Sequence, residues 1–362
     1  MKLHVFNPEH DLALAAKQSQ FTAPHAGRQL RSDLAFIPAL WADEGDFVLV
    51  DDIDNARDKV RHLGAQYINK VEFITKLQLE QVFAHSMEVD SIHPWGWDFA
   101  LKHELTRIGC PEIMLPTDEA LAEIRTMSNR KFWATRLQHG VKYVESLDQL
   151  KQLVVQLGKA VIKAPWSCSG RGVRYVTAED FENSPHHVSL DNWIANIIAR
   201  QGGMTLEPYY NKVKDFGMEF EMRDGKVNYL GLSLFHTIKN AYTGNIIASE
   251  KDKEDMLATY VSRSQQEMLK EHVAAVVGPY LKDVYQGPFG VDMMVCTESA
   301  ESDKTFVNPC IELNLRRTMG HVSLSLAGFG LEHPHVMQVA FDGNRYRLRV
   351  LPGEPSEEAP LH

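Results

Sequence analysis

Cysteine is scarce in this sequence, which has 362 residues and only four of them, Cys110, Cys168, Cys296 and Cys310. No two stand in the C-x-x-C spacing that is typical of zinc sites, and four scattered cysteines are too few for a disulfide scaffold. The sequence therefore indicates neither a structural zinc site nor a disulfide framework. Free thiols suit a reducing compartment, and we expect the protein to be cytoplasmic.

Positive charge and long apolar runs are also in short supply. The chain has 38 Lys and Arg against 48 Asp and Glu, a net charge of -10, which argues against a general affinity for nucleic acid or anionic membranes. No apolar run approaches the roughly 18 residues of a membrane span, and "NPEHD" at 7–11 interrupts the first one before it reaches signal-peptide length. We expect a soluble, unexported protein without nucleic-acid or membrane partners.

The remaining composition is that of a globular protein, with 44% hydrophobic residues and enough length for two or three packed units. Short apolar strands at 2–6 and 47–52 alternate with helix-capable stretches, which predicts an α/β unit at the start of the chain. Two prolines in "CPEIMLPTDEA" (110–120) mark its end. We assign residues 1–116 to this unit.

The rest of the chain begins with helices and then changes to strands. Helices are expected at about 117–127, within 129–140, and after Ser146, which is a suitable cap. From Lys159 onward the pattern is strand-like, and the Asp-Gly pair in "MRDGKV" favours a tight hairpin turn, so we expect a largely antiparallel sheet. Residues 353–362 are expected to form a disordered tail.

The stretch "VIKAPWSCSGRGVRY" (161–175) combines one lysine, Lys163, with a run of small residues. These are Ser167, Ser169, Gly170 and Gly172, and they would allow backbone N–H groups to approach an anion closely. The lysine precedes the glycines and a strand follows them, so the stretch is neither a P-loop nor a dinucleotide fingerprint. Taken alone, it is explained better by a surface hairpin.

A second group of polar residues lies in "PCIELNLRRTMG" (309–320). Glu312, Asn314 and Arg316 follow one another at every second position, so in a strand they share one face within about 13 Å. They either bind a common ligand or ion, or form the outward face of an amphipathic strand. Asp292 is the one charged residue in the apolar "GPFGVDMMV" (287–295), where a buried acid needs a partner or a cation.

The polar segment 296–305 predicts that these two strands form a hairpin. A turn centred near residue 301 or 302 would put Asp292 opposite residue 310 or 312, on the same face as Glu312 and Asn314. Two carboxylates and an amide are oxygen donors that suit Mg²⁺. The alternative is a bulge at Pro309, which would turn Asp292 to the other face.

Weaker candidates occur at three loops. Glu207 stands before Pro208 at a strand-to-loop hinge, where it either accepts a hydrogen bond from an adenine amino group or is an exposed acid before a turn. His236 follows a strand, in a substrate pocket or in an ordinary loop. In the first strand-to-helix turn, Asn7 either caps the helix or, with His10, contacts a substrate.

In this order, and preceded by "SNRKFWATRL" (128–137), these features resemble the ATP-grasp superfamily of carboxylate-amine ligases over roughly residues 117–330. The resemblance implies two α+β subdomains, 117–206 and 207–352, that enclose Mg-ATP. Residues 1–116 resemble the Rossmann-like pre-ATP-grasp domain. The "ExNxR" form is closer to biotin carboxylase than to D-alanyl-D-alanine ligase, but the following "RTMGHVSLSLAGFG" matches neither.

The resemblance also implies a role for each matching residue. The α and β phosphates of ATP would be held by Lys131 and Lys163, with the 167–172 loop over the β and γ phosphates. Backbone groups of 207–210, including Tyr209, would bind the adenine, and Asp215 the ribose. One or two Mg²⁺, or Mn²⁺ in their place, would be held by Asp292, Glu312 and Asn314. Arg316 would stabilise an acyl phosphate or oxyanion, and His236 and Arg317 would lie near the second substrate.

The function implied is an ATP-dependent ligase that joins a small-molecule carboxylate to an amine through an acyl phosphate. A phosphotransferase on the same scaffold would instead leave a stable phosphorylated product. A non-catalytic nucleotide-binding protein should lack part of the metal set, which this sequence retains. Family members are frequently dimers, so a homodimer is expected.

Overall fold

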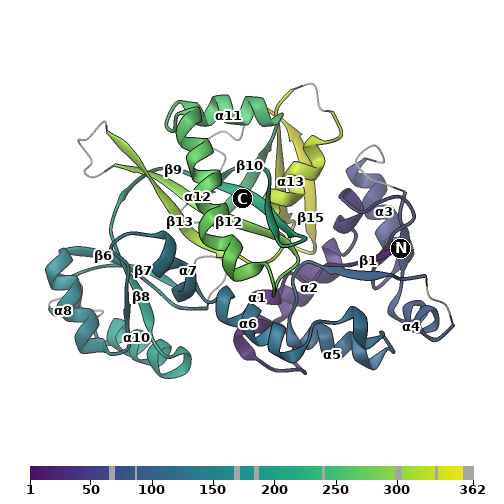
Figure 1. Cartoon of the computed structure of the whole chain (residues 1–362), viewed down its shortest axis with the longest axis horizontal. Coiled ribbons are helices and arrows are strands. Elements are labelled where there is room, and N and C mark those ends of the chain that lie inside the picture. The colour runs from purple at the N-terminus through teal and green to yellow at the C-terminus, as the bar shows by residue number, and fades with distance from the viewer. Residues whose placement is uncertain are drawn as a thin grey trace.

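Three β-sheets organise the chain in the computed structural model, which describes residues 1–64, 70–85, 88–166, 172–182, 187–238, 241–297, 304–330 and 333–353. Figure 1 shows the largest sheet between the other two. The predicted loop residues Ser167, Ser169 and Gly170 lie outside the described residues, as does most of the expected tail. In the described part of the chain, no helix is both long and apolar enough to cross a membrane.

The first unit is built on a parallel sheet, as expected for a Rossmann-like domain. Its elements are β1 (Lys2–Val5), α1 (His10–Ala16), α2 (His25–Leu34), η1 (Ile37–Leu40), β2 (Phe47–Leu49), α3 (Ile53–Leu63), β3 (Glu72–Ile74), α4 (Lys76–His85), β4 (Ser91–Pro94), α5 (Phe99–Arg107) and η3 (Glu112–Met114). The strand order is β3-β2-β1-β4, and all pairs are parallel. The order reverses beside β1, so the loops after β1 and β4 meet at the switch point where ligands bind in open α/β sheets.

The interpretation of Asn7 as a helix cap is wrong. Helix α1 begins at His10 with Glu9 in the cap position and no side-chain cap. The Asn7 amide instead donates to the Gly96 carbonyl at 2.7 Å and to Asp98 Oδ2 at 2.9 Å. The side chain therefore joins the loops after β1 and β4.

The second unit carries a small antiparallel sheet. Its elements are α6 (Asp118–Ser128), α7 (Arg130–Leu137), β5 (Lys142–Val144), α8 (Leu147–Leu157), β6 (Lys159–Lys163), β7 (Val173–Thr177), α9 (Glu179–Glu182), α10 (His187–Gln201) and β8 (Met204–Pro208). The strand order is β5-β8-β6-β7. The Ser146 side chain caps α8 as predicted, accepting from the Gln149 N–H. The same kind of cap, from Thr117, starts α6.

The third unit is the large antiparallel sheet, in the order β13-β12-β9-β10-β11-β14-β15. Its elements are β9 (Asn211–Arg223), β10 (Lys226–Ile238), β11 (Ala241–Ile247), α11 (Glu250–Ala258), α12 (Arg263–Leu281), β12 (Gly287–Thr297), β13 (Thr305–Asn314), α13 (Met319–Ala327), β14 (His335–Phe341) and β15 (Tyr346–Pro352). The predicted turn joins β9 to β10, with positive φ at Asp224 and Gly225.

The two faces of the large sheet differ because side chains alternate along a strand. In β9, Phe216 and Met218 enter a core that also contains Leu257 of α11 and Val273 of α12. The alternate position Glu219 therefore faces the other side of the sheet, which carries the polar residues described below. Helices α11 and α12 thus cover the face of the sheet opposite to those polar residues.

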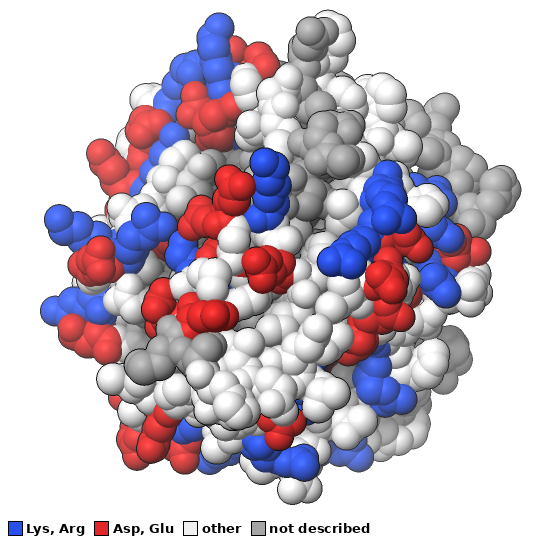
Figure 2. Space-filling view, turned by 90° about the vertical axis from the view of Figure 1, so that its right-hand side faces the viewer, with Lys and Arg blue, Asp and Glu red and all other residues white. Residues whose placement is uncertain are grey.

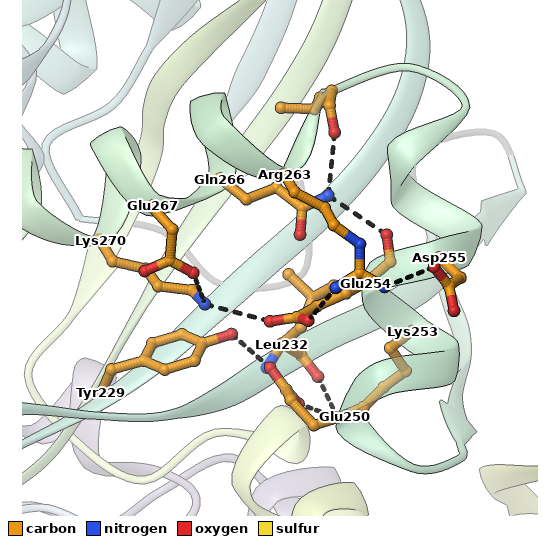
Figure 3. A network of polar contacts seen from close by, with 11 residues as sticks. Tyr229, Leu232, Glu250, Lys253, Glu254, Asp255, Arg263, Gln266, Glu267 and Lys270 are labelled. Atoms are coloured by element: carbon orange, nitrogen blue, oxygen red, sulfur yellow. Dashed lines mark hydrogen bonds and ion pairs between the residues drawn. The ribbon is translucent and has the colours of Figure 1, made fainter.

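A polar network fixes these two helices against β10 (Figure 3). Lys253 is only 2% exposed and pairs with Glu250 at 2.9 Å, while Glu250 accepts from the Tyr229 hydroxyl at 2.6 Å. Glu254 of α11 bonds Lys270 of α12 at 3.2 Å. Every charge in this group has an opposite partner, so the network is structural.

Candidate active site at the edge of the large sheet

The register of β12 and β13 decides whether the predicted acids meet. Asp292 lies directly opposite Glu312, and Gly290 lies opposite Asn314. The ladder shifts immediately afterwards, since Met294 pairs with Asn308 and leaves extra residues on β13. A bulge is therefore present around Pro309, as the alternative supposed, but the pairing of Asp292 with Glu312 is retained.

Asp292 is a carboxyl group held among other acids. Burial, followed by the nearby Glu312 and Glu219, raises the pKa of Asp292 to about 8. Asn314 Nδ2 donates to Asp292 Oδ2 at 3.3 Å. Repulsion of this kind is relieved by a cation, and the oxygen donors fit Mg²⁺.

The protein side chains alone do not supply a full set of ligands for the expected Mg²⁺. Within the described ranges, no three His, Cys, Asp or Glu side chains stand at metal-binding spacing. Asp292 and Glu312 supply carboxylates and Asn314 an amide. Mg²⁺ usually keeps water and substrate phosphate among its ligands, so two carboxylates suffice.

Arg130 is a site residue that the sequence did not reveal. It begins α7, is 9% exposed, donates from Nη2 to Glu312 Oε1 at 2.7 Å and from Nη1 to the Ala164 carbonyl. The predicted Lys131, one residue later, is exposed and lies over the Tyr143 ring, with 3.6 Å between Nζ and the ring centroid. Nothing in the local sequence distinguishes these adjacent cations, because the inward one is defined by its contact with Glu312, 182 positions away.

Lys163 and Glu207 form a buried ion pair on neighbouring strands of the small sheet. Lys163 Nζ lies 2.6 Å from Glu207 Oε2, and both side chains are less than a tenth exposed. Glu207 Oε1 is buried without a hydrogen-bond partner among the described residues. The Glu207 carboxylate thus neutralises Lys163, a contact that the sequence did not predict.

This ion pair and the acids of the large sheet converge on one buried thiol. Burial raises the pKa of Cys310, the charge of Lys163 lowers it, and Glu207, Asp292 and Glu312 raise it further. All four charged groups are therefore within electrostatic reach of Cys310. Lys163 of the small sheet and the carboxylates of the large sheet thus lie near the same thiol.

The predicted hinge joins the two sheets. Strand β8 ends at Pro208 and β9 begins at Asn211, with Tyr209 between them. Lys159 Nζ lies 3.5 Å from the centroid of the Tyr209 ring.

Two further predicted nucleotide contacts lie on or beside the strands. Asp215 is on β9 and pairs with Lys212 at 2.7 Å. Gly172 lies across from β6, where its carbonyl accepts from the Ala164 N–H at 2.8 Å.

The two arginines after β13 have different surroundings. Arg316 is bound to Asp11 of α1, with Nε and Nη2 at 2.9 and 2.8 Å from Asp11 Oδ2, and to Asn314 Oδ1 at 3.0 Å. Burial favours the neutral acid, but Arg316 and His10 hold the pKa of Asp11 well below its ordinary range. Arg316 is thus already neutralised.

Arg317 has no hydrogen-bond acceptor for its guanidinium in the part of the chain that the structure describes. Its Cζ lies 4.4 Å from the centroid of the Trp41 ring. Burial lowers the pKa of Arg317 to about 10, against the opposing charges of Glu221 and Tyr285. Of the two arginines, Arg317 is the one available to a ligand anion.

The remaining candidates belong to the first unit and to β10. The ring of His10 is fully buried and bonds the Trp97 carbonyl and Asp11. Asn7 lines a cavity of about 430 Å³ at the switch point of the parallel sheet, together with Glu9 and Asp98. His236 is half-buried on β10, opposite Gly244 of β11.

Glu219 is a second residue that the sequence did not single out. It is 2% exposed, and its Oε2 lies 2.9 Å from His321 Nδ1. Side chains at Gly290 or Gly320 would collide with its carboxylate, so both glycines leave room for it. The available signal was the alternation in "GMEFE", which puts Glu219 on the opposite face from Phe220.

The raised pKa of Asp292 predicts a pH-dependent stability. Between about pH 4 and about pH 8 the folded protein holds one proton more than the unfolded chain, so this contribution to stability falls as pH rises. We expect Asp292→Asn to gain at least about 1 kcal/mol of unfolding free energy relative to wild type between about pH 5.5 and about pH 7.5, in urea titrations without metal. A constant difference across this range would contradict the assignment.

The comparison with known proteins rests on solved structures, because no protein-family model and no curated protein matches the chain. Biotin carboxylase from Campylobacter jejuni, as a β-γ-ATP complex, is 14% identical with a TM-score of 0.51, over 96% of this chain and 77% of that one. The biotin carboxylase domain of Hydrogenobacter thermophilus 2-oxoglutarate carboxylase, with MgADP, ADP and bicarbonate, is 14% identical with a TM-score of 0.50, over 93% and 74%.

An Archaeoglobus fulgidus protein assigned to the ATP-grasp superfamily is 13% identical with a TM-score of 0.49, over 98% of this chain and 100% of that one. Identities this low show a common fold only. The chain has the ATP-grasp fold, preceded by a Rossmann-like parallel sheet, as the sequence predicted.

Proposed function

We propose that the protein is an ATP-dependent ligase that joins a carboxylate to an amine through an acyl phosphate and releases ADP and phosphate. The observation that carries the proposal is the pairing of Asp292 with Glu312 across β12 and β13, near a thiol whose pKa Lys163 also influences. Arg130 offsets the charge of Glu312, but burial and the neighbouring Glu312 and Glu219 still raise the pKa of Asp292, so a further cation at Asp292 would be stabilising.

In this proposal Asp292, Glu312 and Asn314 hold Mg²⁺, which would neutralise charge on the ATP phosphates. Lys163 contacts a phosphate after exchanging its partner Glu207, and the hinge at Tyr209 contacts the adenine. The protein then positions the carboxylate in line with the γ-phosphate and excludes water from the acyl phosphate.

The arginine roles follow from their contacts. Arg316 positions Asn314 and connects α1 to the end of β13. Arg317 takes over the anion-stabilising role that the sequence assigned to Arg316, since its guanidinium has no hydrogen-bond acceptor among the residues described. The substrates are a small-molecule acid and amine in a reducing cytoplasm, and the cavity beside Asn7 is a candidate site for one of them.

Oxygen transfer distinguishes this reaction from its rivals. A screen of paired acids and amines, read by ADP release, first identifies a turning-over pair. With an ¹⁸O-labelled carboxylate, the ligase leaves one label in the inorganic phosphate, because phosphate departs with the former carboxylate oxygen when the amine attacks. A stable phosphorylated product would establish a phosphotransferase, and nucleotide binding without turnover a binding protein.

A further inference from the structure

A cavity of about 420 Å³ lies between the first unit and the large sheet, far along the sheet order from β12 and β13. Its lining residues come from α2 and α3 of the first unit, with Phe36 shortly after α2, and from β15, with Arg345 just before it. We name it the α3–β15 cavity and define it by the lining residues Leu34, Lys59, His62, Arg345, Leu348 and Arg349. None of them is among the residues assigned to the nucleotide or the metal.

The α3–β15 cavity has an excess of positive charge. Of the cations that line it, Lys59 lies 3.6 Å from Asp33, and Arg347 pairs with Asp342. No hydrogen-bond or ion-pair acceptor for the side chains of Arg345 and Arg349 occurs among the described residues. Two guanidinium groups thus remain uncompensated at one wall of the cavity.

Lys59 is held by the Ser32 carbonyl, to which its Nζ donates at 3.1 Å, and by Asp33 at 3.6 Å. Its side chain is 18% exposed, and burial together with the charge of Arg345 lowers the pKa of its amine despite the nearby Asp33. An ammonium next to a repelling guanidinium is unfavourable in a partly desolvated place, even with these partners. An anion between Lys59 and Arg345 would offset both the burial of the ammonium and its repulsion by the guanidinium.

The edge of β15 supplies neutral donors. It is the last strand of the large sheet, and its Tyr346 N–H points outward to Asp33 Oδ2 at 2.9 Å. The N–H groups of every second residue share one edge of a strand, so the Leu348 N–H points to the same side. Backbone donors at an edge are well suited to a carboxylate or phosphate oxygen.

The floor of the cavity is apolar. Leu34 and Phe36 of the first unit are 1% and 3% exposed, and Leu348 of β15 is 8% exposed. These three side chains are already packed, so the apolar surface that a ligand could cover belongs to the half-buried Leu63 and Tyr346, which also line the cavity.

The described surface around the cavity carries no basic patch that would attract a large polyanion (Figure 2). On the face that carries the first unit, Lys and Arg are interspersed with Asp and Glu rather than collected in one patch (Figure 2). An extended polyanion would therefore meet acids as often as bases. We therefore expect the cavity, and not the open surface, to bind an anion, and the anion must be small enough to enter it.

We propose that the α3–β15 cavity binds a small organic anion, with a carboxylate or phosphate group between Lys59, Arg345 and Arg349 and an apolar body on Leu63 and Tyr346. Such a ligand bridges the first unit to the sheet that carries Asp292 and Glu312. The site is separate from the proposed nucleotide site and does not depend on the proposed reaction.

Phenyl phosphate tests this proposal on the whole chain, by calorimetric titration and by thermal unfolding at constant ionic strength. We expect a dissociation constant of about 1 mM or lower and a rise in melting temperature of about 2 °C or more at saturation. Benzoate is expected to bind at the same place if a carboxylate suffices, which separates the two head groups. Phenol and inorganic phosphate should each bind at least about 10-fold more weakly.

Variants assign the binding to the cavity. Arg345→Gln combined with Arg349→Gln should weaken phenyl phosphate binding by about 10-fold or more, because both side chains are exposed and carry the uncompensated charge. Arg57→Gln, on the same helix as Lys59 but paired with Asp54, is the matched control and should bind as wild type does. ATP turnover should be unchanged in all of them.

The proposal is overturned by three results: no binding of phenyl phosphate or benzoate up to about 10 mM, equal binding by the double arginine variant, or equal binding of phenol. Loss of ligand binding with normal turnover supports the cavity and leaves the ligase proposal untouched. Normal ligand binding in a protein without turnover would contradict the ligase alone.

Discussion

Asp292→Asn and Glu312→Gln should each lower ATP-dependent turnover by about 100-fold to 1000-fold, measured as ADP release with a substrate pair found by screening. Each change removes a negative oxygen donor from the position where the cation is expected. The metal-free Asp292→Asn protein should nevertheless be at least as stable as wild type near neutral pH, because burial and repulsion disfavour the charged acid. Activity and stability would then change in opposite directions, as is typical of a functional residue.

The control for this experiment is Glu271→Gln, which removes an acid from an exposed position of α12. It should turn over as wild type does. If Asp292→Asn and Glu312→Gln also retain activity within a few-fold, these carboxylates do not hold the catalytic metal. A loss of activity that merely follows a loss of folded protein would be equally damaging, so unfolding curves accompany the rates.

Lys163→Met should have the second large effect, because it acts on binding and on stability at once. It removes the cation proposed for a phosphate, and it leaves Glu207 buried without its partner at 2.6 Å. Removing one member of a buried ion pair typically costs about 3 kcal/mol or more. We expect a clear drop in the urea midpoint together with MgADP affinity weakened by about 100-fold.

The double variant Lys163→Met, Glu207→Gln separates these effects. Replacing both members of a buried pair is often nearly neutral, so most of the lost stability should return. Nucleotide affinity should stay low, because the cation is still absent. If the double variant regains MgADP binding along with stability, Lys163 is a structural residue and has no contact with the nucleotide.

The parts of the site that the sequence predicted share a local origin. Alternation along two strands and a polar turn between them were enough to expect Asp292 opposite residue 310 or 312, and the structure has it opposite Glu312. The Asp-Gly turn after β9 and the cap at Ser146 were predictable for the same reason. Each of these depends on neighbours within a few residues or on one hairpin.

The missed contacts join distant segments. Arg130 reaches Glu312 across 182 positions of sequence, and Asp11 reaches Arg316 across 305. No periodicity in one sequence reports which helix end faces which strand end, because that depends on how the three sheets pack. Lys163 was recognised, but its partner Glu207 was interpreted as an adenine contact for the same reason.

The most direct test of the central claim is a calorimetric titration of ADP into wild type and Asp292→Asn, each with and without Mg²⁺. The account predicts that Mg²⁺ strengthens ADP binding to wild type by about 10-fold or more and has little effect on the variant, because Asp292 would carry part of the bridge between metal and phosphate. If ADP does not bind, or if Mg²⁺ changes its affinity equally in both proteins, the assignment of Asp292 and its neighbours as a magnesium-nucleotide site is contradicted.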